Sequence, residues 1–197
     1  AAKQNEIEND FKDITLQENR FGKMLMTAER FDALKESWRN LKIDVSTAGV
    51  KSIDLKLAAL IAQTRHLISR VGDTSNLILD PDLDTYYVMD SVLLKLPEGE
   101  DLLAQAQLLG HQAIEKKIID PAEKASFIAL LGVIKANVDA ANTGLGVAFR
   151  NNPKGNLIPE LETPLESYLT STHDFFELFQ SKIILPESVA LDRKTFQ

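Results

Sequence analysis

The sequence predicts an all-α protein, an elongated antiparallel up-and-down bundle of long helices of the four-helix-bundle type. Several segments place apolar or small residues at alternating spacings of three and four, which is the seam of an amphipathic helix. No segment alternates apolar and polar residues with the period of two expected of a half-buried strand. Hydrophobic residues make up 44% of the 197 residues, with only 9 Gly and 7 Pro. This composition can bury a core and rarely interrupts a helix.

The first two helices are predicted from their apolar spacing. Large apolar residues recur from Ile7 to Leu41, and the stretch Asp44–Gly49 separates this segment from the next. The second helix, of about 28 residues, would be about 42 Å long at 1.5 Å per residue. Long helices with short connections pack antiparallel. The second seam consists of Val50, Ile53, Leu57, Leu60, Thr64, Leu67, Val71, Thr74 and Ile78.

The third helix is predicted from a start signal at Asp80-Pro81. Asp80 is expected as the N-cap and Pro81 in the first helical position, where its missing N–H costs nothing. We expect this helix to reach about Lys95, to break near Pro97-Glu98-Gly99 and to resume over Asp101–Lys117.

The last two helices follow from the same kind of signal. Asp120-Pro121 predicts the start of a long helix, and Gly144-Leu145-Gly146 lies within its seam, where we expect close approach of another backbone. The clearest loop is Asn151–Asn156, and a final helix is expected over Glu160–Ile184. The two seams consist of Phe127, Leu131, Ile134, Val138, Ala141, Leu145 and Ala148, and of Leu161, Leu165, Tyr168, Thr172, Phe175, Phe179 and Ile183.

Composition excludes several functions. The 22 basic and 29 acidic residues give a net charge of −7, which argues against a nucleic-acid partner because phosphate binding needs a basic face. The chain has no cysteine, and its longest apolar run is far shorter than the roughly 18 to 20 residues of a membrane span. His66, His111 and His173 lie far apart, and no Glu-x-x-His pair is present. We therefore expect no catalytic residue, no metal site, no cofactor and no enzyme activity.

A dense set of polar residues runs from Arg65 to Asp90, across the junction of the second and third helices. On the third helix, residues three and four positions apart lie on neighbouring faces. One interpretation is structural, with helix caps, a tyrosine hydroxyl bonded to a carboxylate and a surface ion pair. The other is a small polar pocket with apolar walls between helices. The candidate ligand-binding residues are Arg65, Arg70, Asn76, Tyr86, Tyr87 and Asp90.

The run Val71–Asp90, VGDTSNLILDPDLDTYYVMD, resembles a signature of the extracytoplasmic sensor regions of bacterial transmembrane receptors, including methyl-accepting chemotaxis proteins and sensor histidine kinases. A weaker similarity extends from Phe31 through Trp38 to Ile184. Relatives often carry a longer apolar helix after Pro97, a pattern from which Glu98-Gly99-Glu100 departs. The resemblance implies that residues 1–197 form one periplasmic sensor domain. Both ends of the sequence suggest a fragment of a longer inner-membrane protein, anchored by flanking membrane helices.

The resemblance implies a role rather than a ligand. Such a domain passes a ligand-induced helix displacement to a cytoplasmic signalling module. Because Arg65 and Arg70 are the arginines near the predicted pocket, we expect a small carboxylate as the ligand. The seams could face the interior of one monomer or pair two chains as a homodimer in the parent receptor. The alternative function is a helical scaffold or protein-interaction bundle without a small-molecule ligand.

Overall fold

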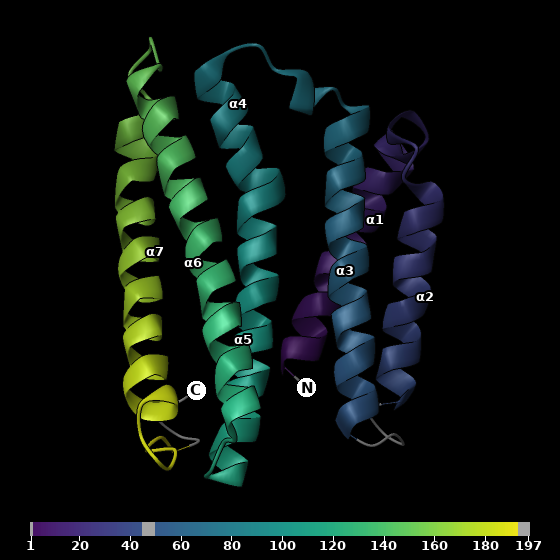
Figure 1. Cartoon of the computed structure of the whole chain (residues 1–197). Helices are drawn as coiled ribbons and strands as arrows, with labels where there is room; N and C mark the ends of the chain where they lie inside the picture. Colours follow the sequence, from purple (N-terminus) through teal and green to yellow (C-terminus); the bar gives the residue numbers. More distant parts are fainter. Residues whose placement is uncertain (1, 45–49, 193–197) are drawn as a thin grey trace. The chain divides into compact units, whose positions relative to one another are not determined.

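The computed structural model describes residues 2–44 and 50–192, which are helical nearly throughout and include no strand (Figure 1). The predicted all-α helical bundle is confirmed. The chain divides into two compact units, Ala1–Asp80 and Pro81–Gln197, here named unit 1 and unit 2. The predicted separation Asp44–Gly49 includes residues 45–49, which lie outside the described residues.

Unit 1 contains α1 (Ala2–Leu25), α2 (Ala28–Asp44), α3 (Val50–Thr74) and the short 3₁₀ turn η1 (Leu77–Leu79). The prediction of one helix over the first segment is wrong, because the chain turns at Met26 and Thr27. Met26 adopts a left-handed conformation with φ of 52°, and the N–H of Thr27 donates to the carbonyl of Gly22 at 3.0 Å. The second helix also ends earlier than predicted, at Thr74 instead of Ile78, because Asn76 turns the chain with φ of 62°.

The core of unit 1 is centred on aromatic side chains of α1 and α2. Phe11 of α1 stacks on Trp38 of α2 with ring centroids 6.0 Å apart, and its ring lies 6.3 Å from that of Phe31. The predicted seam of α3 contributes Leu60 and Leu67 to this core. The buried members of the cluster are Phe31, Leu34, Trp38, Leu41, Leu60 and Leu67, with Ile7, Phe11 and Ile53 packed against them.

Unit 2 begins with α4 (Leu83–Asp90), which continues through a π-helical turn, η2 (Ser91–Lys95), into α5 (Leu96–Lys116). The predicted N-cap Asp80 is wrong, because Asp82 directly precedes α4. The predicted break near Pro97 is also wrong. The N–H of Leu96 donates to the carbonyl of Ser91, five residues back, and Pro97 follows in the first turn of α5. A proline is tolerated in a first turn, since no N–H is required of it there.

The remaining helices are α6 (Pro121–Arg150) and α7 (Leu157–Phe179), which continues into a second π-helical turn, η3 (Gln180–Ile184). The predicted start of α6 is confirmed: Asp120 and Glu123 form a capping box, each side chain accepting a hydrogen bond from the backbone N–H of the other. The predicted loop Asn151–Asn156 is also confirmed. The last helix begins at Leu157, slightly before the predicted Glu160, and its expected end at Ile184 agrees with the structure.

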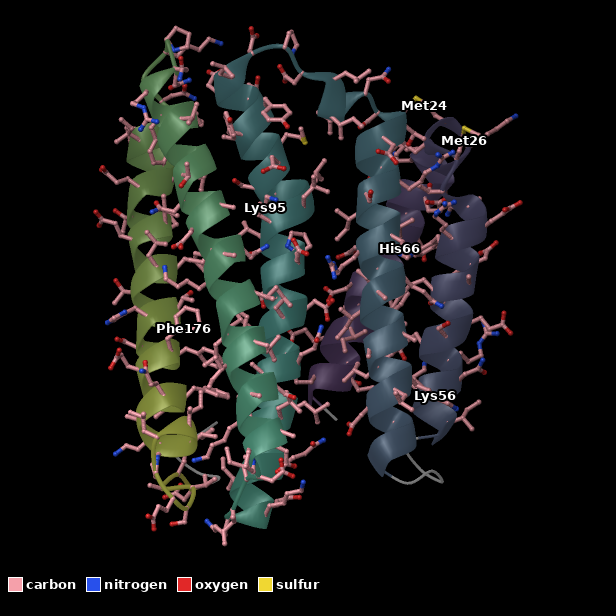
Figure 2. All side chains as sticks on the ribbon, in the orientation of Figure 1. Met24, Met26, Lys56, His66, Lys95 and Phe176 are labelled. Carbon is pink, nitrogen blue, oxygen red and sulfur yellow. The ribbon has the colours of Figure 1, made fainter. Side chains whose placement is uncertain are left out.

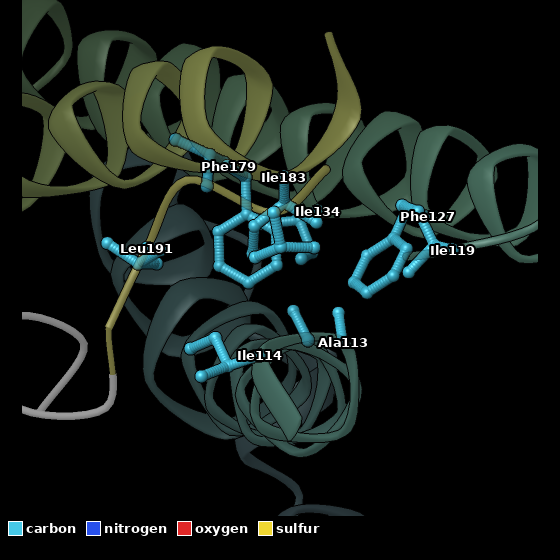
Figure 3. Packing of buried hydrophobic residues seen from close by; sticks show 11 residues of the cluster. Ala113, Ile114, Ile119, Phe127, Ile134, Phe179, Ile183 and Leu191 are labelled. Carbon is cyan, nitrogen blue, oxygen red and sulfur yellow. The ribbon is translucent and has the colours of Figure 1, made fainter. Parts of the chain in front are cut away.

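The core of unit 2 gathers around α6, which contacts α4, α5 and α7. Figure 3 shows Phe179 and Ile183 beside Ile134, with Ala113 and Ile114 directed toward them from α5. The tail that follows η3 belongs to the same core. The N–H of Val189 donates to the carbonyl of Lys117 at 2.7 Å, and the side chains of Val189 and Leu191 are buried. The tail is therefore fastened to the turn between α5 and α6.

Candidate functional site

The candidate residues fall into two groups, because the run from Arg65 to Asp90 crosses the boundary between the units at Asp80-Pro81. Arg65 and Arg70 lie on α3, and Asn76 lies in the turn after it, all in unit 1. Tyr86, Tyr87 and Asp90 lie on α4 in unit 2. Each group is described within its own unit.

Arg70 lies near the end of α3, opposite the turn between α1 and α2. Its Nη2 donates to the sulfur of Met26 at 3.4 Å, a weak acceptor. Its Nε is buried and has no hydrogen-bond partner among the described residues. A buried guanidinium N–H without an acceptor is costly. Figure 2 labels Met26 at this turn.

The same turn holds a carboxylate with one unpartnered oxygen. The buried hydroxyl of Thr27 donates to Glu18 Oε2 at 2.8 Å, while Glu18 Oε1 is buried without a hydrogen-bond partner in the described structure. Glu18 lies over Gly22, where an added Cβ would come within 1.7 Å of Oε1. The turn between α1 and α2 thus brings an acceptor to Thr27 and a donor to the adjacent Met26. The sequence did not single out Glu18, whose partner Thr27 lies beyond its own helix.

Arg65 and Asn76 differ from Arg70 in their surroundings. Arg65 is half-buried on α3, and Asn76 is exposed. The carbonyl of Asn76 accepts the N–H of Leu79 at 3.0 Å, and its own N–H donates to Asp73 at 3.4 Å. Asparagine tolerates the left-handed conformation better than most residues, so the turn accounts for its identity.

The two tyrosines of α4 lie outside the buried core of unit 2, since Tyr86 is 37% exposed and Tyr87 is half-buried. The rings of Tyr86 and Tyr87 meet edge to face with centroids 5.2 Å apart. A Cβ added to Gly144 would lie 2.9 Å from the ring of Tyr87, so this glycine admits an aromatic ring and not the backbone that was predicted. No described hydrogen bond joins either hydroxyl to the half-buried Asp90. The predicted carboxylate–hydroxyl bond is therefore not among the described contacts.

Unit 2 contains two further polar contacts that the sequence did not predict. Asn152 donates to Asp84 Oδ2 at 2.9 Å, and this hydrogen bond is the main reason that the pKa of Asp84 lies below its ordinary value. The bond fastens the start of α4 to the loop after α6. No local spacing relates these two residues, which are 68 positions apart.

The second contact lies between α5, α6 and α7. Asn137 is 8% exposed and donates to Glu98 Oε2 at 3.1 Å, while its Oδ1 has no hydrogen-bond partner in the described part of the chain. A Cβ on Gly99 would lie 3.0 Å from that oxygen and 3.1 Å from the hydroxyl of Tyr168. Burial, followed by the charge of Glu100, raises the pKa of Tyr168. The signal in the sequence was an asparagine beside the apolar seam of α6.

The structure describes residues 2–44 and 50–192. These residues include no group of three or more His, Cys, Asp or Glu side chains that could hold a metal ion. No helix within them combines the length and the apolar character needed to cross a membrane.

No family model matches the chain, and neither a curated protein nor a solved structure matches it.

Proposed function

We propose that this chain is the extracytoplasmic ligand-sensing domain of a bacterial transmembrane receptor, and that its ligand is a small carboxylate. The resemblance of the run Val71–Asp90 supports the role. The observation that carries the ligand class is the buried Nε of Arg70, which has no hydrogen-bond partner among the described residues. A carboxylate accepts strong, charge-assisted hydrogen bonds from a guanidinium.

The position of Arg70 suggests how binding would produce a signal. A ligand held by Arg70 would join the end of α3 to the turn at Met26, and the unpartnered Oε1 of Glu18 would favour a ligand that also carries a donor, such as an ammonium group. Packed helices occupy discrete arrangements, so the ligand would favour one register of α3 over another. The displacement would pass to flanking membrane helices and a cytoplasmic signalling module.

A thermal-shift screen of the full chain against organic acids, amino acids, amines, nitrate and simple sugars tests this proposal. A carboxylate at about 100 times its Kd should stabilise the chain by about 2.7 kcal/mol. The shift should disappear in Arg70→Ala and persist in Arg39→Ala, which removes an exposed arginine of α2. A shift that Arg70→Ala leaves intact, or no shift with any carboxylate, contradicts the proposed site.

A second function, a helical scaffold that binds a partner protein or a second copy of the chain, is favoured by the outer face of α6. Ile128 and Val133 are 58% and 52% exposed, and Gly132 between them has open space around it. The exposed residues Ala125, Ala129 and Ala136 continue this apolar face. Sedimentation velocity of the chain and of Val133→Lys tests it. Self-association that the lysine abolishes would support the scaffold, and a monomer at every concentration would remove the homodimer.

A further inference from the structure

A cavity of about 230 Å³ opens where α5 ends and α6 begins, within unit 2. Its floor is apolar and consists of Leu109, Ala113, Ile119 and Phe127. Three of these side chains are almost fully buried, with exposed fractions of 2%, 7% and 3% for Ala113, Ile119 and Phe127. Figure 3 shows Ile119 beside Phe127, with Ala113 directed toward them from α5. The volume exceeds that of an engineered apolar cavity of about 150 Å³ that binds benzene.

The rim of the cavity is polar and includes Gln112, Asp120, Glu123 and Ser126. Both carboxylate oxygens of Glu123 have partners within the protein: Oε1 pairs with Lys116, and Oε2 accepts the N–H of Asp120. The Lys116 hydrogen bond is the main cause of the lowered pKa of Glu123. The Lys116–Glu123 pair is therefore neutral as a whole.

Asp120 supplies the remaining charge at the rim. Its Oδ1 accepts the N–H of Glu123 at 2.8 Å in the helix cap, and no described hydrogen bond reaches Oδ2. Lys116 pairs with Glu123, and the charge of Asp120 contributes to its raised pKa only after that of Glu123, while Lys124 donates to the carbonyl of Pro186 at 3.2 Å. The end of α5 and the start of α6 present opposite helix dipoles, which largely cancel. The carboxylate of Asp120 therefore determines the sign of the electrostatic potential at the rim.

We infer that this cavity binds a small organic cation with an apolar body, such as a monocyclic arylalkylammonium ion. The apolar body fills the space over Phe127 and Ile119, and the ammonium group lies at Oδ2 of Asp120. This site is separate from Arg70 and does not depend on the carboxylate ligand proposed for unit 1.

A ligand bound in the cavity should also affect the tail that follows α7. Ile119 and Phe127 belong to the same core cluster as Val189 and Leu191. The N–H of Val189 is bonded to the carbonyl of Lys117, two residues before Ile119. A ligand packed against Ile119 therefore stabilises the turn to which the tail is fastened, and it slows hydrogen exchange at the amide of Val189.

Three probes with the same ring test the assignment: benzylammonium, benzyl alcohol and benzoate. NMR titration of the full chain should show binding of benzylammonium about fivefold tighter than of benzyl alcohol, as expected for opposite charges at contact distance in water. Benzoate should bind more weakly than the alcohol. Exchange at the Val189 amide should slow with benzylammonium. Equal affinity for the three probes, or no binding of any of them, overturns the assignment.

Two pairs of variants locate the site. Asp120→Asn keeps a competent helix cap and removes the charge, so it should abolish the preference for the cation while leaving benzyl alcohol binding unchanged. Asp139→Asn, an exposed aspartate farther along α6 that pairs with Lys135, is the matched control and should keep the preference. Ser126→Phe should fill the mouth and abolish binding of all three probes, whereas Ser126→Ala should retain it. Binding that survives Ser126→Phe places the ligand elsewhere and overturns the site.

The outcome is independent of the carboxylate screen. Arg70→Ala should leave benzylammonium binding intact, because Arg70 belongs to unit 1 and the cavity to unit 2. Loss of benzylammonium binding in Arg70→Ala would contradict the separation of the two sites.

Discussion

Unit 1 and unit 2 are both built from long helices, but they differ in charge. Residues 1–80 contain twelve acidic and twelve basic side chains, so unit 1 has no net charge. Residues 81–197 contain seventeen acidic and ten basic side chains, and unit 2 therefore carries the whole net charge of −7. The charge of the complete sequence consequently says little about Arg70. An anionic ligand is not opposed by its own unit there, whereas a cationic ligand is favoured in unit 2.

The aromatic residues provide a separate optical signal for each unit. The single tryptophan, Trp38, lies in the core of unit 1, and the three tyrosines, Tyr86, Tyr87 and Tyr168, all lie in unit 2. Tryptophan emission therefore reports on unit 1, and tyrosine absorbance reports on unit 2. The two units can be compared in one sample of the unmodified chain.

The largest expected effect comes from truncating a buried phenylalanine in each unit. Phe179→Ala removes a fully buried ring that lies 4.5 Å from Phe175 and 5.8 Å from Phe127, and it should destabilise unit 2 by about 3–5 kcal/mol. Phe31→Ala should destabilise unit 1 by a similar amount. In a urea titration, each variant should lower the unfolding midpoint that is measured by the optical signal of its own unit. If each variant shifts both signals equally, the units unfold together and the comparison fails.

A smaller effect separates two glycines of α6. Gly144→Ala places a Cβ 2.9 Å from the ring of Tyr87, which must move, so we expect a loss of about 1–3 kcal/mol. Gly132→Ala meets nothing within 4 Å and should stabilise unit 2 by about 0.5–1 kcal/mol through its better helix propensity. Urea titration followed by tyrosine absorbance measures both. Equal effects of the two substitutions would show that Tyr87 does not restrict Gly144.

The smallest expected effect is a loss of stability of unit 1 at acidic pH. Glu8 accepts hydrogen bonds from Lys42 and Trp38, and the bond to Lys42 is the main cause of its lowered pKa. A carboxyl with a lowered folded pKa stabilises the fold above its unfolded pKa, about 4.3 for glutamate, and the contribution is lost as pH falls through the folded value. We expect Trp38 emission to change in this window below about pH 4.3. The change should be absent in Glu8→Gln and present in Glu6→Gln; a titration that persists in Glu8→Gln contradicts it.

The sequence predicted elements whose signals are local. Asp120-Pro121 fixed the start of α6 because an N-cap and a proline act on the residues next to them. Pro97 wrongly predicted a helix break, because the π-helical turn at Ser91–Lys95 changes which N–H groups are needed. No residue next to this turn indicates it in the sequence. The turn at Met26-Thr27 contains neither glycine nor proline, so its signal was missed.

The contacts around the candidate residues could be predicted less completely than the fold. Arg70 was identified as a donor, and its buried Nε gives that choice a physical basis. Asn76 was selected as a hydrogen-bond donor because of its residue type. Its left-handed conformation in the turn accounts for an asparagine at this position. Glu18 and Asn137 could not be found from spacing, because the groups around them belong to other helices or turns.

The tail after α7 has a mechanical consequence. A pulling force applied to the chain at Leu191 would first load the hydrogen bond between Val189 and Lys117 and the buried side chain of Leu191. The load would then reach the turn between α5 and α6 as well as the axis of α7. The tail therefore links the end of α7 sideways to the turn between α5 and α6. A pull along α7 would be shared with that turn, and α7 would resist sliding past the antiparallel α6.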